Sequence, residues 1–436
     1  MSVTTTIPMR YSGRVRDLAP AVYRWLYERS TSSDPEVRDS VTSAIAHVRT
    51  RGDAALRELA QRYDGVSLDA LEVPRARVAR ALDALDPAMR RAMERAARNI
   101  THAHAAMKPQ SFVCEPEPGI VIGRRPDPLA RVGVYAPGGD AAYPSSVLMG
   151  ALPARAAGVG EIVLCSPPRG AEPSPLVLAA AAIAEVDRVF AVGGAGAIAA
   201  MAYGTETIPR VDRIVGPGNA YVAEAKLQVT GAVAIDSPAG PSELLVIADE
   251  TCDPRGVALE LLAQAEHDPR ACAVAVVIGD GTARSLTTAI AAALAAQPRR
   301  DVIARAFANN GGVLVAESLR EAIAFAADYA PEHLLLAVAD ADSALDRVRN
   351  AGTVFVGATA SVAFGDYMTG ANHVLPTGGL ARSYSGLSPL DFVRWTTYQR
   401  VSARAAAALA PDVAAFAVGE GLPGHAMAAR SAGGLT

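Results

Sequence analysis

Lysine is nearly absent from this chain of 436 residues. Lys108 and Lys226 are the only lysines among its 41 basic residues, so arginine carries almost all of the positive charge. We interpret this preference as a genomic bias. The formal net charge is only −4, and no run of like charges forms an acidic or basic tail. Because nucleic-acid binding normally needs a basic surface, no nucleic-acid partner is expected.

Cysteine is also scarce. The four cysteines, Cys114, Cys165, Cys252 and Cys272, are far apart in the sequence and form no CxxC pair. Scattered cysteines of this kind favour reduced thiols in a cytoplasmic protein over a framework of disulfide bonds.

Long hydrophobic runs are missing as well. The longest apolar region, 176–202, is interrupted by charged residues and a glycine cluster, whereas a membrane-spanning helix takes about 20 uninterrupted apolar residues. The N-terminus has no basic segment followed by an apolar one, so no signal peptide is expected. The sequence therefore predicts a soluble, cytoplasmic protein with no membrane partner.

The hydrophobic half of the composition is sufficient for two or more domains. Residues 33–110 have helical patterns, with Asp34 as an N-cap and Pro35 at the first helical position. From about residue 131, short apolar runs alternate with alanine-rich helical patterns, which predicts βαβ units and a mainly parallel sheet. Residues 392–436 return to a helical pattern. The predicted strands are 131–135, 161–165, 188–192, 213–215, 243–248, 272–278, 312–315 and 333–338.

Four of the seven histidines lie beside or near an acid, an amide or a turn in the C-terminal half: His267, His333, His373 and His425. Imidazole is a common metal ligand and titrates near neutral pH. The grouping therefore suggests a metal site joined to an acid–base pair.

Gln264 and His267 are three residues apart on a predicted helix, which places them on one face about 5–6 Å apart at Cβ. Asp366 follows a glycine, and His425 follows a Gly-Leu-Pro-Gly turn. Together they would form a set of two nitrogen and two oxygen donors, which suits zinc. Spacing alone leaves open a capping histidine with a solvated amide, and it does not establish that the four side chains converge.

Glu332 and His333 stand at the entrance of a predicted strand, 334–338. Loops at strand ends of an α/β sheet are common catalytic positions. Glu332 would activate water, and His333 would take a proton from an alcohol. The alternative is an exposed Glu-His pair on a turn.

Two glycine-rich turns are predicted between a strand and a helix. The segment 192–199 fits the pattern GxGxxA, and 216–219 precedes a helix over 220–229. Backbone N–H groups at helix starts suit phosphates, and Tyr135 in a third turn would stack on a base or ribose. Tight packing turns remain the alternative, because no acid follows at the end of the next predicted strand.

Longer motifs resemble those of the histidinol dehydrogenase family and follow one order along nearly the whole chain. They are 131–139 (RVGVYAPGG), 143–149 (YPSSVLM), 216–222 (GPGNAYV), 239–243 (AGPSE), 264–267 (QAEH), 330–333 (APEH), 365–367 (GDY), 370–377 (GANHVLPT) and 420–422 (EGL) with His425.

The resemblance implies an α/β fold with two Rossmann-like, aldehyde-dehydrogenase-like parallel-sheet domains, a helical N-terminal segment and a small helical C-terminal domain. The implied division is an N-terminal segment (1–30), a larger domain with the catalytic and zinc residues (31–129 and 240–385), an inserted NAD-binding domain (130–239) and a dimerisation domain (386–436).

The resemblance also implies a homodimer that oxidises L-histidinol to L-histidine in two steps, with NAD and one zinc ion per subunit. Gln264, His267, Asp366 and His425 would be the zinc ligands, and Glu332 and His333 the catalytic pair; all six would also contact the substrate. Ser242, His373 and Glu420 would complete the substrate site, and Tyr135 and Asn219 would contact NAD. Subunits of this family share active sites, so Glu420 and His425 would serve the neighbouring subunit.

One departure from the family pattern lies at Gly196, where the family usually has a glutamine of the NAD site. Losing that side-chain hydrogen bond costs about 0.5–1.5 kcal/mol, which corresponds to NAD binding weaker by about two- to tenfold. The GxGxxA match is then a result of this substitution and not a dinucleotide fingerprint.

The sequence leaves three alternative functions open. A paralogue of the same fold would oxidise another small alcohol, such as a sulfonated diol, but the retained Ser242, His373 and Glu420 favour histidinol. A zinc hydrolase would use Glu332 to activate water without a redox cofactor. A catalytically silent NAD-binding module is suggested only by Gly196.

Overall fold

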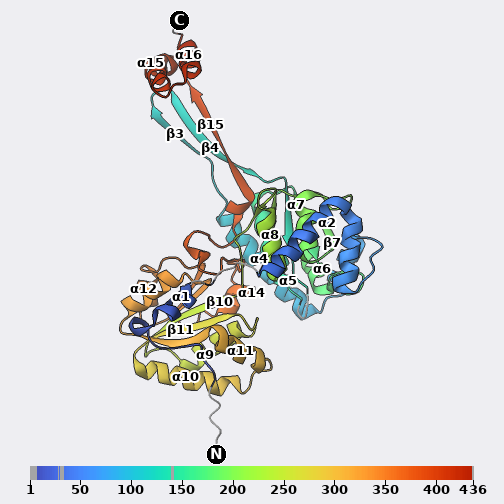
Figure 1. Cartoon of the computed structure of the whole chain (residues 1–436), viewed down its shortest axis with the longest axis vertical. Coiled ribbons are helices and arrows are strands. Elements are labelled where there is room, and N and C mark those ends of the chain that lie inside the picture. Colours follow the sequence, from blue (N-terminus) through green and yellow to red (C-terminus); the bar gives the residue numbers. More distant parts are fainter. Residues whose placement is uncertain (1–6, 28, 30–33, 139–141, 435–436) are drawn as a thin grey trace, which may run out of the picture.

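The computed structural model describes residues 7–27, 29, 34–138 and 142–434. Two α/β domains form the body of this described part, and a long arm projects from the body with helices α15 (Ala403–Gly419) and α16 (Pro423–Ala432) at its tip (Figure 1). The predicted α/β fold with two parallel-sheet domains is confirmed. None of the described helices is long and apolar enough to cross a membrane.

The first domain is built on a parallel sheet, called here the β10 sheet, with the strand order β1-β12-β11-β10-β13-β14. Along β10, Leu244 and Val246 pack on one helix layer, and Leu245 and Ile247 pack on the other. Because both faces are covered, the strands are continuous apolar runs. The strands are β1 (Tyr11–Arg14), β10 (Glu243–Ala248), β11 (Cys272–Ile278), β12 (Gly311–Ala316), β13 (His333–Ala337) and β14 (Thr353–Val356).

One layer on the β10 sheet contains α9 (Pro254–Ala265), α10 (Asp280–Leu294), α11 (Arg300–Asn310) and α14 (Val362–Tyr367), and the other contains α1 (Pro20–Tyr27), α12 (Leu319–Tyr329) and α13 (Ala341–Leu345). Short 3₁₀ turns are η1 (Val15–Asp17), η3 (Leu380–Arg382) and η4 (Pro389–Phe392).

The second domain is built on the β5 sheet, with the order β2-β7-β6-β5-β8-β9 and only β2 antiparallel among its described strands. Its strands are β2 (Glu72–Val73), β5 (Arg131–Tyr135), β6 (Glu161–Ser166), β7 (Arg188–Ala191), β8 (Arg213–Val215) and β9 (Ala234–Ile235). Helices α2 (Pro35–Leu59), α7 (Gly194–Tyr203) and α8 (Ala220–Val229) pack together, as do α3 (Arg75–Asp83), α4 (Pro87–Ala106), α5 (Pro144–Ala157) and α6 (Pro175–Ile183).

The arm consists of an antiparallel ribbon in the order β15-β4-β3, followed by the α15–α16 hairpin (Figure 1). Its strands are β3 (Phe112–Glu117), β4 (Ile120–Pro128) and β15 (Val393–Val401). The buried residues of the two helices are all alanines: Ala405, Ala410, Ala414 and Ala417 in α15 and Ala426 in α16. Phe416 and Met427 remain 72% and 70% exposed, so the tip offers an apolar surface that this chain does not cover.

The domain division differs from the expected one. Residues 31–129 were assigned to the domain that contains 240–385, but α2 to α4 pack on the β5 sheet, and β2 pairs with β7. The reason is physical: the apolar faces of α2 and α4, including Val41, Leu56 and Ile100, complete the core of that sheet. The rest of this stretch, β3 and β4, forms the arm.

The described parts of the N-terminal and C-terminal segments also differ from the predicted ones. The N-terminal segment 1–30 is not separate in its described residues, because β1 pairs with β12 and joins the β10 sheet. Residues 392–436 are helical only from Ala403, because β15 pairs with β4 before them. The eight predicted strands and the Asp34 cap of α2 are confirmed, with small differences at strand ends.

Candidate functional site

A cleft of about 530 Å³ lies between the two domains. From the β10 sheet side it is lined by residues at the amino ends of β10 and β13 and at the end of α9. From the β5 sheet side it is lined by the Gly216–Asn219 loop. The predicted site residues that it brings together are Ser242, Gln264, His267, Glu332, His333, Asp366, His373 and Asn219.

Glu332 and His333 are both buried, and the backbone of Glu243 holds both of them. The Glu243 N–H donates to Glu332 Oε2 at 2.7 Å, and His333 Nδ1 lies 2.9 Å from the Glu243 carbonyl oxygen. A carbonyl can only accept, so Nδ1 carries the proton of this bond. The other ring nitrogen, Nε2, is buried and makes no hydrogen bond within the described chain; its nearest charged group is Asp366 Oδ1 at 3.6 Å. The alternative of an exposed Glu-His pair on a turn is therefore excluded, and Nε2 is the ring nitrogen left to exchange a proton.

The charges around His333 determine how it titrates. Burial lowers its pKa, but the Glu332 and Asp366 carboxylates outweigh burial and raise the pKa to about 10. Burial raises the pKa of Glu332, against the opposing charge of His333. Burial also acts to raise the pKa of Asp366, but the nearby His333 ring, whose Nε2 lies 3.6 Å from Asp366 Oδ1, brings that pKa below its ordinary value. The charge of His333 thus shifts the pKa values of both carboxyl groups, and they shift that of His333; such coupling is typical of acid–base sites.

Two of the candidate metal donors, Gln264 and His267, lie at the end of α9. Helix α9 ends at Ala265, so His267 lies in the bend after the helix and not on its face as predicted, yet it lines the cleft with Gln264. The Gln264 amide is buried, and its Nε2 has no hydrogen-bond partner in the described chain. No cluster of three His, Cys, Asp or Glu side chains able to hold a metal occurs among the described residues.

An amide, an imidazole and a carboxylate from Gln264, His267 and Asp366 nonetheless face one cleft. The Gln264 amide oxygen, an imidazole nitrogen of His267 and a carboxylate oxygen of Asp366 are donors that suit zinc. The residues present therefore fit a metal ion, and three of the four predicted donors lie in this cleft.

Glu420 and His425 are not in this cleft. Glu420 follows α15, and His425 lies in the first turn of α16, so both are exposed at the tip of the arm (Figure 1). The structure thus separates them from the other predicted ligands and substrate contacts of the same chain.

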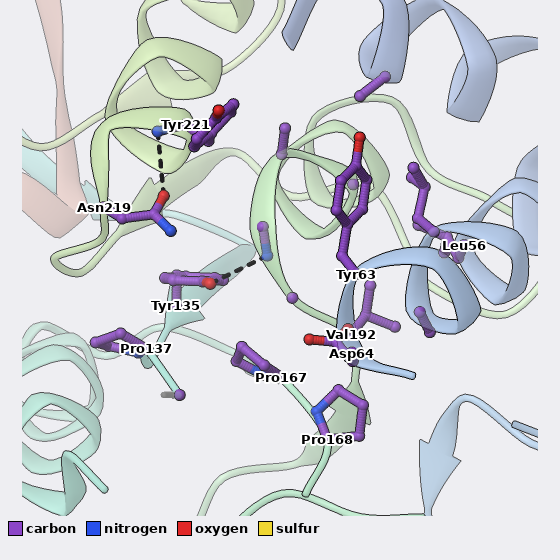
Figure 2. A pocket seen from close by; sticks show the side chains of 18 of the residues that line it. Leu56, Tyr63, Asp64, Tyr135, Pro137, Pro167, Pro168, Val192, Asn219 and Tyr221 are labelled. Carbon is purple, nitrogen blue, oxygen red and sulfur yellow. Dashed lines mark hydrogen bonds between the residues drawn. The ribbon is translucent and has the colours of Figure 1, made fainter. Parts of the chain in front are cut away.

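A second cavity of about 660 Å³ lies at the carboxyl ends of β5, β6 and β7 (Figure 2). Carboxyl ends of parallel strands are where nucleotides bind in open α/β sheets. Tyr135 is buried there and accepts a hydrogen bond from the Gly194 N–H at 3.1 Å; burial raises its pKa to about 12. Asn219 caps α8 with its amide oxygen, which leaves its NH₂ group as a donor.

Gly196 lies in the wall of this second cavity, in the first turn of α7. A Cβ atom there would come within 2.9 Å of Leu59 Cδ1 and 3.3 Å of Leu56 Cδ2. The space that a longer side chain would use is therefore partly filled by two leucines of α2. The position lines the cavity but contributes no polar group.

The sequence patterns did not identify several residues of these walls. Tyr63 and Asp64, in the π-helical turn Ala60–Asp64 after α2, line the second cavity together with Pro167 and Pro168 (Figure 2). Burial raises the pKa of Asp64. Gly65 after these two residues is an ordinary helix stop signal, so the local pattern indicated a helix end and not a cleft.

Comparisons with known proteins agree with this arrangement. The family model described as histidinol dehydrogenase matches residues 27–432. The histidinol dehydrogenase of Halobacterium salinarum is 50% identical over 413 residues, covering 94% of this chain and 96% of the relative. That of Methanosarcina barkeri is 43% identical over 420 residues, covering 96% of each.

A solved structure gives the same result. The crystal structure of histidinol dehydrogenase from Elizabethkingia anophelis superposes with a TM-score of 0.91 at 33% identity and covers 97% of both chains. The predicted resemblance is thus confirmed over nearly the whole length. This chain belongs to the histidinol dehydrogenase family and is an oxidoreductase.

Proposed function

We propose that this chain oxidises L-histidinol to L-histidine through L-histidinal, by two successive hydride transfers to NAD, as the last steps of histidine biosynthesis. The observation that carries the proposal is the junction of the two cavities. Pro137, Gly138 and Asn219 line both of them, so a ligand at the carboxyl ends of the β5 sheet reaches the cleft of Glu332 and His333.

We propose one zinc ion per subunit, held by Gln264, His267 and Asp366, with His425 of a second copy as the fourth ligand. When bound, zinc would anchor the amino and imidazole nitrogens of the substrate, and NAD would accept the hydride. Ser242 and His373 line the same cleft and would hold the substrate, with Glu420 of the second copy.

A homodimer with shared active sites follows from this assignment. The exposed apolar surface at the tip, which includes Phe416 and Met427, supports it, because such surfaces mark protein–protein contacts. The described cysteines are all free, which supports a cytoplasmic location.

In the first oxidation, the neutral form of His333 would accept the proton of the alcohol at Nε2, because Nδ1 already donates to the Glu243 carbonyl. Since the pKa of His333 is raised to about 10, the fraction of this neutral form, and with it the rate, is expected to increase as the pH rises towards 10. The second oxidation needs an added oxygen atom. No cysteine is among the described residues that line the cleft, which disfavours a covalent thiohemiacetal. Glu332 would therefore activate a water molecule, which adds to the aldehyde before the second hydride leaves.

The test of this function is the amount of NADH formed per histidinol, with and without a chelator. Two equivalents that are lost on chelation are expected. One equivalent would indicate oxidation that stops at the aldehyde, turnover of other alcohols in place of histidinol would identify a paralogue, and water-dependent cleavage without NADH would identify a hydrolase.

The roles of the pair are tested by Glu332→Gln. Because the amide cannot accept a proton, the second oxidation, started from histidinal, is expected to fall by about 100-fold or more, within the range for general bases, while the first is retained. Equal losses in both half-reactions would contradict the assignment of water activation to Glu332.

A further inference from the structure

A buried ion pair between Arg29 and Glu243 adjoins the Glu332–His333 pair. Arg29 Nε donates to Glu243 Oε1 at 2.8 Å, and Arg29 Nη2 lies 3.1 Å from Glu243 Oε2, so the contact is bidentate. The two side chains are only 9% and 2% exposed. Arg29 also stacks on the Tyr329 ring at 3.4 Å and donates to the Tyr329 carbonyl at 2.8 Å. Its orientation is fixed from several sides.

Glu243 connects this ion pair to the acid–base pair. It opens β10 next to the first residue of β13, since Leu244 is paired in register with His333. Its N–H bonds Glu332 and its carbonyl bonds His333, while its carboxylate accepts from Arg29 and from the Gly378 N–H at 2.9 Å. Any shift of Glu243 would therefore move the partners of both Glu332 and His333 at once.

Stability alone does not account for such a pair. Desolvating two ions costs several kcal/mol, and packed apolar residues often stabilise a core as well or better. Fixed donor and acceptor positions are what an ion pair supplies and an apolar pair does not. Glu243 and Arg29 do not line the cleft, so neither is placed to touch the substrate.

We propose that the Arg29–Glu243 ion pair is a positioning device that sets the geometry of Glu332 and His333. This inference rests on the proposed function, in which those two side chains move protons. Arg29 and Glu243 are positioning residues and not catalytic ones. Because a misplacement of about 1 Å can reduce a rate by about 100-fold, loosening the pair is expected to reduce kcat more than substrate affinity.

The test is steady-state and half-reaction kinetics of Arg29→Met in the full chain. We expect kcat to fall by about ten- to 100-fold while KM for histidinol and for NAD stays within about twofold. Both half-reactions are expected to slow by similar factors, since Glu243 holds both residues; this differs from Glu332→Gln, which slows the second. Arg29→Lys keeps the charge but not the bidentate geometry, and is expected to recover a factor of about three or more.

The matched control is Arg155→Met, which breaks the partly buried Arg155–Asp187 pair of the β5 sheet domain, away from both cavities. It is expected to lower the unfolding temperature and leave kcat unchanged. If Arg29→Met does not fold, the double variant Arg29→Met/Glu243→Gln, which leaves no buried ion unpaired, is measured in its place with the same criteria.

A folded variant with kcat within twofold of wild type, or with kcat and KM changed by equal factors, would overturn the positioning role alone. A wild-type protein that forms no NADH from histidinol would instead refute the proposed function. The positioning role is thus tested on the variants, and the proposed function is tested on the wild-type protein.

Discussion

The cleft of the body and the tip of the arm contain predicted site residues in opposite physical states. In the cleft, Glu332, His333 and Gln264 are buried, and the first two are fixed by backbone hydrogen bonds. At the tip, Glu420 and His425 are exposed. The chain thus positions most of the proposed site through its own β10 sheet. The remaining two residues lie on the arm, for which a second copy is the proposed partner.

The two regions also differ in how they are packed. The β10 sheet is covered on both faces by helices, whereas the arm helices bury only alanines against each other. A surface as apolar as the tip gains most by burial against another molecule.

The largest effect is expected for His425→Ala at the tip. Although the side chain lies outside the cleft of its own chain, we expect kcat/KM for histidinol to fall by about 100-fold or more, because even indirect partners of a metal ligand are worth about 10- to 100-fold. Bound zinc, measured on the purified protein, is expected to fall as well. Arg430→Ala, on the same exposed helix, is the control and is expected to change neither kcat/KM nor bound zinc. A His425→Ala protein with wild-type activity would show that the arm contributes no residue to the active site.

A smaller effect is expected in the body for Gly196→Gln. The new amide would restore a polar group to the second cavity if the flexible ends of Leu56 and Leu59 move aside. We expect KM for NAD to fall by about two- to tenfold, with kcat unchanged, from the value of one hydrogen bond. An increase in KM would mean that the leucines do not yield and that the cavity is adapted to glycine.

No change in activity, only in stability, is expected for His104→Leu in α4, the helix that leads into the arm. His104 is 1% exposed, neither ring nitrogen has a partner in the described chain, and burial lowers its pKa to about 4 from 6.5. The unfolded chain therefore binds the proton first as the pH falls. The stability contributed by the neutral ring is complete above pH 6.5 and is lost as the pH falls towards 4.

From pH 7 to pH 5, wild type is expected to lose about 2 kcal/mol more unfolding free energy than His104→Leu. Urea denaturation of both proteins at each pH measures this difference. Equal losses of unfolding free energy in the two proteins would show that the pKa of His104 is not lowered in the folded state.

The two sheets and the residue types of the cleft were predictable from the sequence. The strands of both sheets were predictable, because parallel strands covered on both faces are continuous apolar runs, as in β10 and β11. Glu332, His333, Gln264 and Asp366 were found through residue type and motif, and the structure brings them into one cleft. Their burial and the Nδ1 bond that leaves Nε2 free depend on tertiary contacts that no local pattern contains.

The arm and the wall residues were not predictable in the same way. β15 was predicted as helix, since the half-exposed ribbon has no continuous apolar run and its pairing with β4 spans most of the chain. Arg29 and Glu243 are 214 residues apart, so only the fold shows that they meet. Motif matching identified His425 but gave no position for it relative to the cleft.

The most direct test of a site shared between copies is activity after mixing two inactive variants, His333→Asn in the cleft and His425→Ala in the arm. Co-expression or joint refolding at equal amounts gives about half mixed dimers, each with one complete site of two, so about a quarter of wild-type activity is expected. If His425 served the cleft of its own chain, every site would lack one group, and mixing would restore no activity.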